Sequence, residues 1–236
     1  MLNYLNVFFL FFLVLLCGCG TFKTTSRTAL TDDFYTIKNK KRNERVYVKK
    51  DEEVIMIFPT KPNENKKADT SNLVGVYKEI SLRGHKDIVL LRRNSFDIDF
   101  LTIPLKFRPM TSGVPAQLNT EINASAYFGL RTDRFTIEYE QNPSGIQERV
   151  VKHFGFSFGG LTGIGSTLVS PTTTNDQTEQ EYDGIVWTKG VAGIFALNSV
   201  TIGISLGFDN LLDQNRSIWI YESKPWIGFT LGLNLN

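Results

Sequence analysis

The last third of the chain alternates, with a period of two, between large apolar residues and small or polar ones. In 200–209 the even positions hold Val, Ile, Leu or Phe, and the odd positions hold Thr, Gly, Ser or Asp. The segment 227–235 follows the same rule with the opposite parity. Because a β-strand directs successive side chains to opposite faces, this pattern predicts strands with one apolar face and one small, polar face.

Eight strand-like runs of this kind follow residue 84. They are 86–93, 97–108, 120–131, 134–140, 150–167, 184–197, 199–209 and 226–235. No long stretch places apolar residues at i, i+3, i+4 and i+7, so we expect very little helix. The pattern therefore predicts an all-β protein.

The connections between the runs indicate how the strands are arranged. Asn198-Ser199 is a two-residue hairpin signal, whereas 169–183 and 210–225 are long connections. Small transmembrane barrels combine short periplasmic turns with long outer loops and an even number of strands. We therefore expect 84–236 to form an eight-stranded antiparallel up-and-down transmembrane β-barrel, with its C-terminus on the periplasmic side. The connection 131–134 is short for an outer loop.

The polar face of the predicted strands carries mostly Gly, Ser and Thr, with few of the Lys and Glu residues of a solvated face. A narrow barrel interior explains this composition, because it has room for little side-chain volume. The charged residues on the inferred inward parity are Lys106, Arg108, Arg131, Arg134, Glu138 and Glu140. We expect a charge network in the lumen, formed by the first two and last two of these, that closes the pore. For Arg131 and Arg134, solvated positions at strand ends are at least as good an interpretation.

Two places break the alternation. Lys189 falls on the outward parity of its run, where a lysine at the middle of a membrane costs roughly 2–4 kcal/mol. Either a bulge shifts the parity there or the lysine extends to the interface. The parity also changes between Phe100 and Leu101, which requires a bulge or a strand start.

The N-terminus has the features of an export signal. The apolar run 8–16 is too short to span a membrane as a helix and has the length of a signal-peptide core. It ends in Leu16-Cys17-Gly18-Cys19, which resembles a bacterial lipobox. The resemblance implies removal of a signal peptide, 1–18, and acylation of Cys19. The alternative is a plain signal peptide cut near Gly18 or Gly20.

The segment between Cys19 and the predicted barrel divides into two parts. Residues 19–44 are polar and have the composition of a tether. Residues 45–72 predict a β-hairpin over 45–59 and a linker over 60–72, which is rich in Pro, Asn and charged residues. We expect the hairpin to pack under or into the barrel as a periplasmic plug.

Composition excludes several classes of site. The two cysteines both lie in the export signal, so we expect no disulfide and no thiolate metal site in the mature chain. Two histidines are too few for a His-based metal cluster. The net charge of +2, from 26 basic and 24 acidic residues, argues against a nucleic-acid binder. The Gly-rich segment 159–167 lacks the Gly-Lys-Ser/Thr ending of a phosphate-binding loop, so we expect strand glycines there and no cofactor.

The candidates for catalysis are few. His153 and Ser157 share the inward parity of one run, but the expected topology puts His153 at the periplasmic end, and a structural role is the better interpretation. His85 precedes the first run and suggests no site. Asp97 and Asp99 share a strand face without a third catalytic partner, and solvated edge positions explain them equally well. We therefore expect no enzymatic activity.

Two segments carry a family resemblance. The segment 100–109, with Ile103-Pro104-Leu105-Lys106-Phe107, resembles the "IPL-K-aromatic" strand of small outer-membrane β-barrel proteins of the Bacteroidetes type. The segment 226–233 is similar to the Gly-alternating last strand of that family. Family members usually end in an aromatic residue, whereas this chain ends in Leu235-Asn236. The resemblance covers 84–236 and implies fold and location rather than an activity.

Together these observations predict a non-enzymatic outer-membrane β-barrel protein, lipid-anchored at Cys19 on the periplasmic side. Its expected contacts are outer-membrane lipid and an envelope protein or extracellular ligand, bound through the loops 169–183 and 210–225, with a structural or surface-interaction role. One alternative is an outer-membrane lipid-modifying enzyme. The other is a soluble β-sandwich lipoprotein that serves as a binding module.

Overall fold

The computed structural model describes residues 29–38, 43–61, 64–81, 88–197 and 200–233. The expected signal peptide, Cys19, His85 and the Asn198-Ser199 turn lie outside the described residues. The described part is all-β, with antiparallel pairing and two short 3₁₀ segments. None of its helices is long and apolar enough to cross a bilayer.

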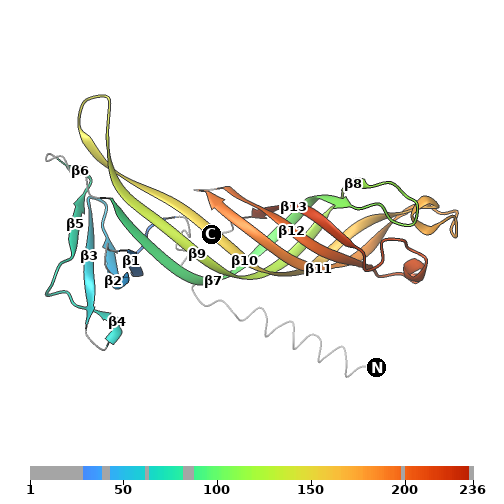
Figure 1. The fold of residues 1–236 in the computed structure, drawn as a ribbon, viewed down its shortest axis with the longest axis horizontal. Helices are drawn as coiled ribbons and strands as arrows, with labels where there is room; N and C mark the ends of the chain where they lie inside the picture. Colours follow the sequence, from blue (N-terminus) through green and yellow to red (C-terminus); the bar gives the residue numbers. More distant parts are fainter. Residues whose placement is uncertain (1–28, 39–42, 62–63, 82–87, 198–199, 234–236) are drawn as a thin grey trace, which may run out of the picture.

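The strands fall into a short N-terminal group and a long C-terminal group (Figure 1). The first group is β1 (Asp33–Lys38), β2 (Asn43–Lys50), β3 (Val54–Lys61), β4 (Glu64–Ala68), β5 (Gly75–Lys78) and β6 (Ile80–Ser81). The second is β7 (Val89–Arg108), β8 (Gln117–Thr120), β9 (Asn123–Gln141), β10 (Gln147–Val169), β11 (Tyr182–Leu197), β12 (Val200–Leu211) and β13 (Pro225–Leu233). The 3₁₀ segments are η1 (Thr172–Thr174) and η2 (Gln214–Ser217).

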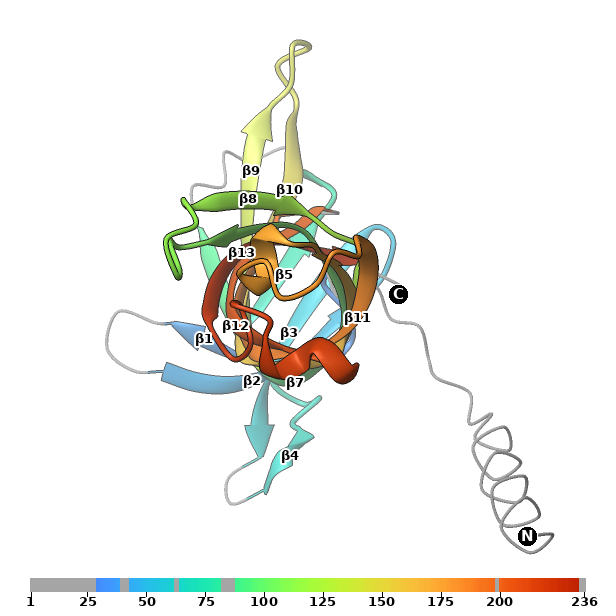
Figure 2. The ribbon, with the colours of Figure 1, turned by 90° about the vertical axis from the view of Figure 1, so that its right-hand side faces the viewer.

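Six strands of the second group form a closed ring. The order is β7-β9-β10-β11-β12-β13, and β13 pairs back onto β7. Figure 2 shows these strands arranged around a common axis. The short strand β8 pairs with the end of β7. One edge of β7 is therefore hydrogen-bonded first to β9 and then to β8.

The ring has six strands where the sequence pattern predicts eight. The runs 86–93 and 97–108 belong to the single strand β7, and 120–131 and 134–140 belong mostly to β9. The polar residues between the runs are part of the ladder instead of a turn: Asn94 lies opposite Thr132, and Asp133 lies opposite Arg93, the last residue of the first run. The short 131–134 connection is therefore part of a strand and not a loop.

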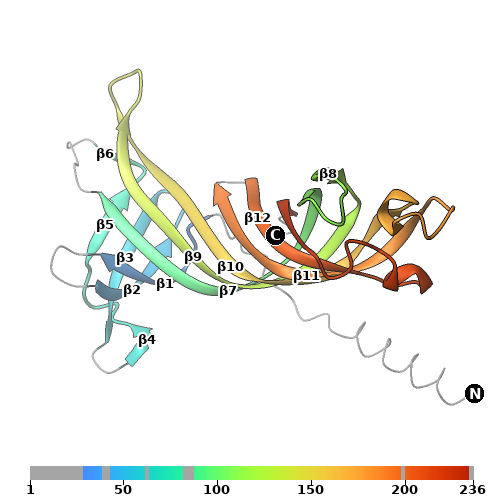
Figure 3. The same cartoon turned by 45° about the vertical axis from the view of Figure 1, so that its right-hand side comes forward.

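The N-terminal strands form a second series of paired strands, which begins at the end of β7 and returns to the end of β10 (Figures 1 and 3). β1 pairs with β2 and β7, β2 with β3, and β3 with β5. β6, one residue after β5, pairs with β10, which continues to β9 and β7. We call β1–β6 and the adjoining ends of β7, β9 and β10 the N-terminal unit. The predicted hairpin is β2–β3, while β1 occupies part of the predicted tether and β4 part of the predicted linker.

The N-terminal unit has a hydrophobic core of its own. Its buried residues are Leu30, Tyr35, Val46, Val48, Ile55, Ile57, Val89, Leu91, Phe135 and Ile137. Leu91 and Phe135 lie on the inward parity of β7 and β9, the same parity that faces the ring interior further along. Two strands thus pass from an apolar core into a more polar interior without changing face.

A bulge in β7 changes the parity near Pro104. Phe229 lies opposite Leu105 while Leu231 lies opposite Thr102, so one extra residue of β7 sits between these pairs. Ile103 and Lys106 are both fully buried although one is odd and the other even. Proline has no N–H for the ladder and is tolerated at such a position. Leu101 and Ile103 are still on the inward face. The change of parity therefore comes after Ile103, and not between residues 100 and 101 as the sequence predicts.

Candidate functional site

Four charged side chains meet inside the ring, and we call Lys106, Arg108, Glu121 and Asp209 the interior charge cluster. Lys106 Nζ lies 2.9 Å from Asp209 Oδ2, and Arg108 Nη2 lies 2.6 Å from the same oxygen. Glu121 lies 3.5 Å from Lys106 and 3.4 Å from Arg108. All four side chains are at most 6% exposed. Two cations and two carboxylates thus balance within the interior.

Neutral groups complete this cluster. Thr188 donates a hydrogen bond of 2.7 Å to Asp209, and Lys106 donates one of 3.0 Å to Asn123. The ring of Trp226 lies 4.8 Å from Lys106 Nζ, and two further aromatic rings flank Arg108. These neutral and aromatic groups surround the ion pairs, although Arg108 Nε and Nη1 have no hydrogen-bond partner among the described residues.

Glu138 and Glu140 do not join Lys106 and Arg108. Since β9 continues without a turn, both glutamates lie on its outward parity, in the N-terminal unit. They form ion pairs with Lys152 of β10, at 2.7 Å for Glu140. Hydrogen bonds to the two carboxylates raise the pKa of Lys152, and the bond from Lys152 lowers the pKa of Glu140. The expected network is thus half in the interior and half on the outer face.

Sequence reasoning missed the two carboxylates that face Lys106 and Arg108. Asp209 is the one charged residue on the inward parity of β12, and that position could have identified it. Glu121 lies between β8 and β9, outside any strand, so alternation could not predict which face it occupies. The Asp209 contacts join residues more than 100 positions apart in the chain, so strand alternation alone cannot pair them.

A second polar set lies where the ring meets the N-terminal unit. Asp133 Oδ1 lies 2.8 Å from His153 Nε2 and 2.8 Å from Arg131 Nε, and Asp133 Oδ2 lies 3.7 Å from Arg93. Arg131 is therefore an interior residue, whereas Arg134 is exposed on the outward face. The carboxylate is surrounded by three basic groups in a buried position.

His153 and Ser157 do not form a catalytic pair. They are four residues apart on one face of β10, a separation of about 13 Å along a strand. Ser157 instead forms a hydrogen bond of 2.8 Å with Tyr127. Asp97 is buried on the inward parity, and Asp99 lies on the same face. Within the described residues, no group of three or more His, Cys, Asp or Glu side chains could hold a metal ion.

The outer face of the ring is apolar, and we call its exposed large side chains the apolar belt. Its members are Phe96, Ile98, Phe100, Phe107, Phe128, Leu130, Phe154, Phe156, Phe158, Ile164, Leu168, Ile185, Trp187, Val191, Phe195, Ile204, Leu206, Phe208, Ile227 and Phe229. Leu130 is 74% exposed and Phe96 is 62% exposed. All six ring strands contribute, so the belt surrounds the ring.

Lys189 lies within this belt on the outward parity. Its register is regular, with Trp187 opposite Asn210 and Lys189 opposite Phe208, so no bulge moves it inward. Its Nζ lies 4.5 Å from the centre of the Trp187 ring. Of the two explanations that the sequence leaves open, the structure excludes the bulge.

The two long connections fold over one end of the ring. Ile220 donates a backbone hydrogen bond of 3.0 Å to Thr173 of η1, which joins the connection after β12 to the one after β10. Trp219, Ile220 and Tyr221 pack into a buried cluster with ring residues such as Val186. Glu222 accepts hydrogen bonds from Asn210, the Leu211 amide and Arg216. The loops predicted to bind a partner thus form an ordered cap.

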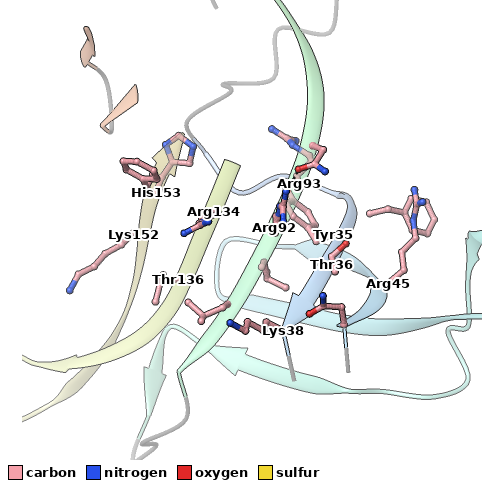
Figure 4. A pocket seen from close by; sticks show the side chains of 16 residues that line it. Tyr35, Thr36, Lys38, Arg45, Arg92, Arg93, Arg134, Thr136, Lys152 and His153 are labelled. Atoms are coloured by element: carbon pink, nitrogen blue, oxygen red, sulfur yellow. Dashed lines mark hydrogen bonds between the residues drawn. The ribbon is translucent and has the colours of Figure 1, made fainter. Parts of the chain in front are cut away.

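A basic groove lies outside the junction between the N-terminal unit and the ring (Figure 4). It has a volume of about 790 Å³. Its outward-facing basic residues are Lys38, Arg45, Arg92, Arg134 and Lys152, and none of the described lining residues carries a carboxylate. Arg93 and His153 also border it, but their side chains lie on the inward face near Asp133. The side chains come from β1, β2, β7, β9 and β10. Because these strands are far apart in sequence, no local motif identifies the groove.

Comparison of the chain with protein-family models, with curated proteins and with solved structures finds no match.

Proposed function

We propose that this chain is a non-enzymatic outer-membrane β-barrel protein whose six-stranded ring spans the bilayer. The observation that supports the proposal is the apolar belt around a ring whose interior holds paired charges. Soluble monomers rarely expose a contiguous apolar patch of more than a few hundred Å². An apolar outer band around an interior with polar groups is the arrangement of transmembrane barrels. Here the interior also contains an apolar cluster that includes Ile103, Leu161 and Trp226.

The length of the belt agrees with a bilayer. On β10 the outward large residues extend from Phe154 to Leu168. Those fourteen residue steps cover about 46 Å along the strand, or about 33 Å along the membrane normal at a tilt of roughly 45°. The hydrocarbon core is about 30 Å thick. A six-stranded ring is smaller than the usual eight-stranded minimum, and its filled interior supports a structural or interaction role over conduction.

The proposal includes an orientation. A lipid on Cys19 would hold the N-terminal unit at the periplasmic face, because few residues separate Cys19 from Leu30, the first residue of the unit's core. The loops after β10 and β12 then face outward. The hydrophobic core of the N-terminal unit suits a part that folds in water. The role in this proposal is structural, or an interaction through the capped outer end with an envelope protein or extracellular ligand.

The experiment is heat modifiability of the full-length protein on SDS gels. The unboiled sample should run faster than the boiled one. In a separate detergent phase separation, the Cys19→Ser variant should remain in the detergent phase. Leu130→Glu in the belt should reduce membrane assembly, while Ile146→Glu, in the turn after β9, should not. A single unshifted band, with release of Cys19→Ser into the aqueous phase, would instead support a soluble lipoprotein.

A further inference from the structure

The basic groove combines unneutralised positive charge with a concave surface. Two of its cations have carboxylate partners outside the lining: Arg93 pairs with Asp33 and Asp133, and Lys152 pairs with Glu138 and Glu140. Among the described residues, no carboxylate pairs with the other four cationic side chains of the lining. These are Lys38, Arg45, Arg92 and Arg134.

Two of these arginines face each other directly. Arg92 of β7 lies opposite Arg134 of β9 in the antiparallel register, and both side chains are exposed on the outward face. Arg92 is oriented by a hydrogen bond of 3.2 Å from its Nε to Asn94. Like charges opposite each other destabilise a sheet, so an anion held between the two guanidinium groups would relieve a repulsion present in the fold.

The groove adjoins the apolar belt. Arg134 lies opposite Phe154, which lines the groove and also belongs to the belt. Four residues further along the strands, the facing positions are Phe96, Leu130 and Phe158, which all belong to the belt. The arginine pair is thus about 13 Å along the strands from a fully apolar row. Because the pair lies level with Phe154, the end of the belt, it lies at the boundary between the hydrocarbon core and the headgroups.

We propose that the basic groove binds the phosphate of an anionic membrane phospholipid in the leaflet next to the N-terminal unit. Arg92 and Arg134 supply paired N–H donors to the phosphate oxygens, a geometry that guanidinium groups favour. Lys38 and Arg45 add positive charge at the other side of the groove. Phe154, level with Arg134 at the end of the belt, offers an apolar surface to the glycerol and the start of the acyl chains.

An acidic peptide would also be attracted to this charge. The lipid is favoured because the groove continues into the belt. The arginines can then bind the phosphate while the belt contacts the acyl chains of the same molecule. The inference rests on the proposed membrane location. It adds a specific lipid site, which the belt alone does not require.

The experiment is native mass spectrometry of the full-length protein released from detergent micelles, with phosphatidylglycerol or phosphatidylcholine of identical acyl chains. The protein should retain phosphatidylglycerol preferentially. Arg92→Gln/Arg134→Gln should weaken that binding by about a hundredfold or more, since each lost charged hydrogen bond is worth about tenfold or more. Lys49→Gln/Lys50→Gln removes the same charge from exposed positions outside the groove and should leave binding unchanged.

Three results would overturn the lipid site. They are equal retention of the two lipids, equal retention by Arg92→Gln/Arg134→Gln and the wild type, and displacement of the lipid by free glycerol phosphate or by polyglutamate at comparable concentration. The gel shift on heating distinguishes the two proposals. A protein that keeps the shift but shows no lipid preference contradicts the groove alone, while loss of the wild-type shift contradicts the membrane ring.

Discussion

Arg108 and Asp209 lie 2.6 Å apart inside the ring, although 101 residues separate them in the chain. Their strands, β7 and β12, are not hydrogen-bonded neighbours, because β13 stands between them. The contact therefore belongs to the interior and not to a sheet ladder. Asp209 also accepts hydrogen bonds from Lys106, so one buried carboxylate holds two buried cations.

Removing the charge of Asp209 should destabilise the ring. Asp209→Asn leaves Lys106 and Arg108 with Glu121 as their one described carboxylate partner. Breaking a buried ion pair in this way typically costs about 3–5 kcal/mol. The unboiled, fast-running form should convert to the unfolded form at a lower temperature. Asp183→Asn, an exposed position at the start of β11, should leave the conversion temperature unchanged, and equal behaviour of the two variants would contradict the role of Asp209.

The ring should also depend on a small residue at Gly159. A Cβ there would overlap the backbone of Phe128 and Gly129, which is a part of the structure that cannot yield as a flexible side chain can. Gly160, the next residue, is exposed and the nearest atom to its Cβ would be 3.8 Å away. Gly159→Leu should therefore abolish the gel shift of the folded ring, whereas Gly160→Leu should preserve it. Folded protein from both variants would show that the interior is wider than described here.

The cap over the ring end should loosen in acid. Burial acts to raise the pKa of Glu222, but the hydrogen bonds from Asn210, the Leu211 amide and Arg216 outweigh it, and the pKa lies below its ordinary value. A lowered pKa in the folded state means that the carboxylate stabilises the cap above the unfolded pKa of about 4.3. That stabilisation is lost as the pH falls through the folded-state value. Hydrogen exchange in 212–224 should therefore increase from neutral pH to about pH 3, after correction for intrinsic rates.

The matched variant for this pH dependence is Glu222→Gln. It should exchange faster at neutral pH and respond less to acid, because the titrating group is gone. Glu179→Gln changes an exposed glutamate in the other loop and should behave as wild type. An unchanged acid response in Glu222→Gln would assign the effect to a different group.

The alternation of residue types identified the strands, but not the number of strands. The interior is polar only in part, because it also holds a buried apolar cluster of Leu101, Ile103, Tyr127, Leu161, Ala192, Ile194 and Trp226. Residues such as Asn94 and Thr132 resemble turn formers, yet they lie opposite each other in a continuous ladder and Thr132 donates a hydrogen bond to Asn94. The amino-acid sequence alone does not distinguish polar residues that pair inside a strand from polar residues that form a turn. Once β9 is read as continuous, the parity of Glu138 and Glu140 reverses, and their exclusion from the interior follows.

The candidate sites depend on contacts between distant segments, which a single sequence does not reveal. Lys106 and Arg108 were identified from parity, but their partner Asp209 requires knowing that β12 lies across the ring from β7. The basic groove needs β1 to pair with β7, and β1 is too short for its alternation to stand out from a polar tether. The opposition of Arg92 and Arg134 appears only when the register of β7 and β9 is known.

Glu138 and Glu140 provide a test of which carboxylates matter to the ring. Both lie on the outer face and pair with Lys152, whose side chain is 58% exposed. Exposed ion pairs contribute little to stability because water screens them and the side chains lose freedom when they pair. Glu138→Gln/Glu140→Gln should therefore unfold at the wild-type temperature in the gel assay, in contrast to the single change Asp209→Asn. If the double variant were the less stable of the two, the interior network would have to be extended along β9 into the N-terminal unit, and the register of β9 described here would be wrong.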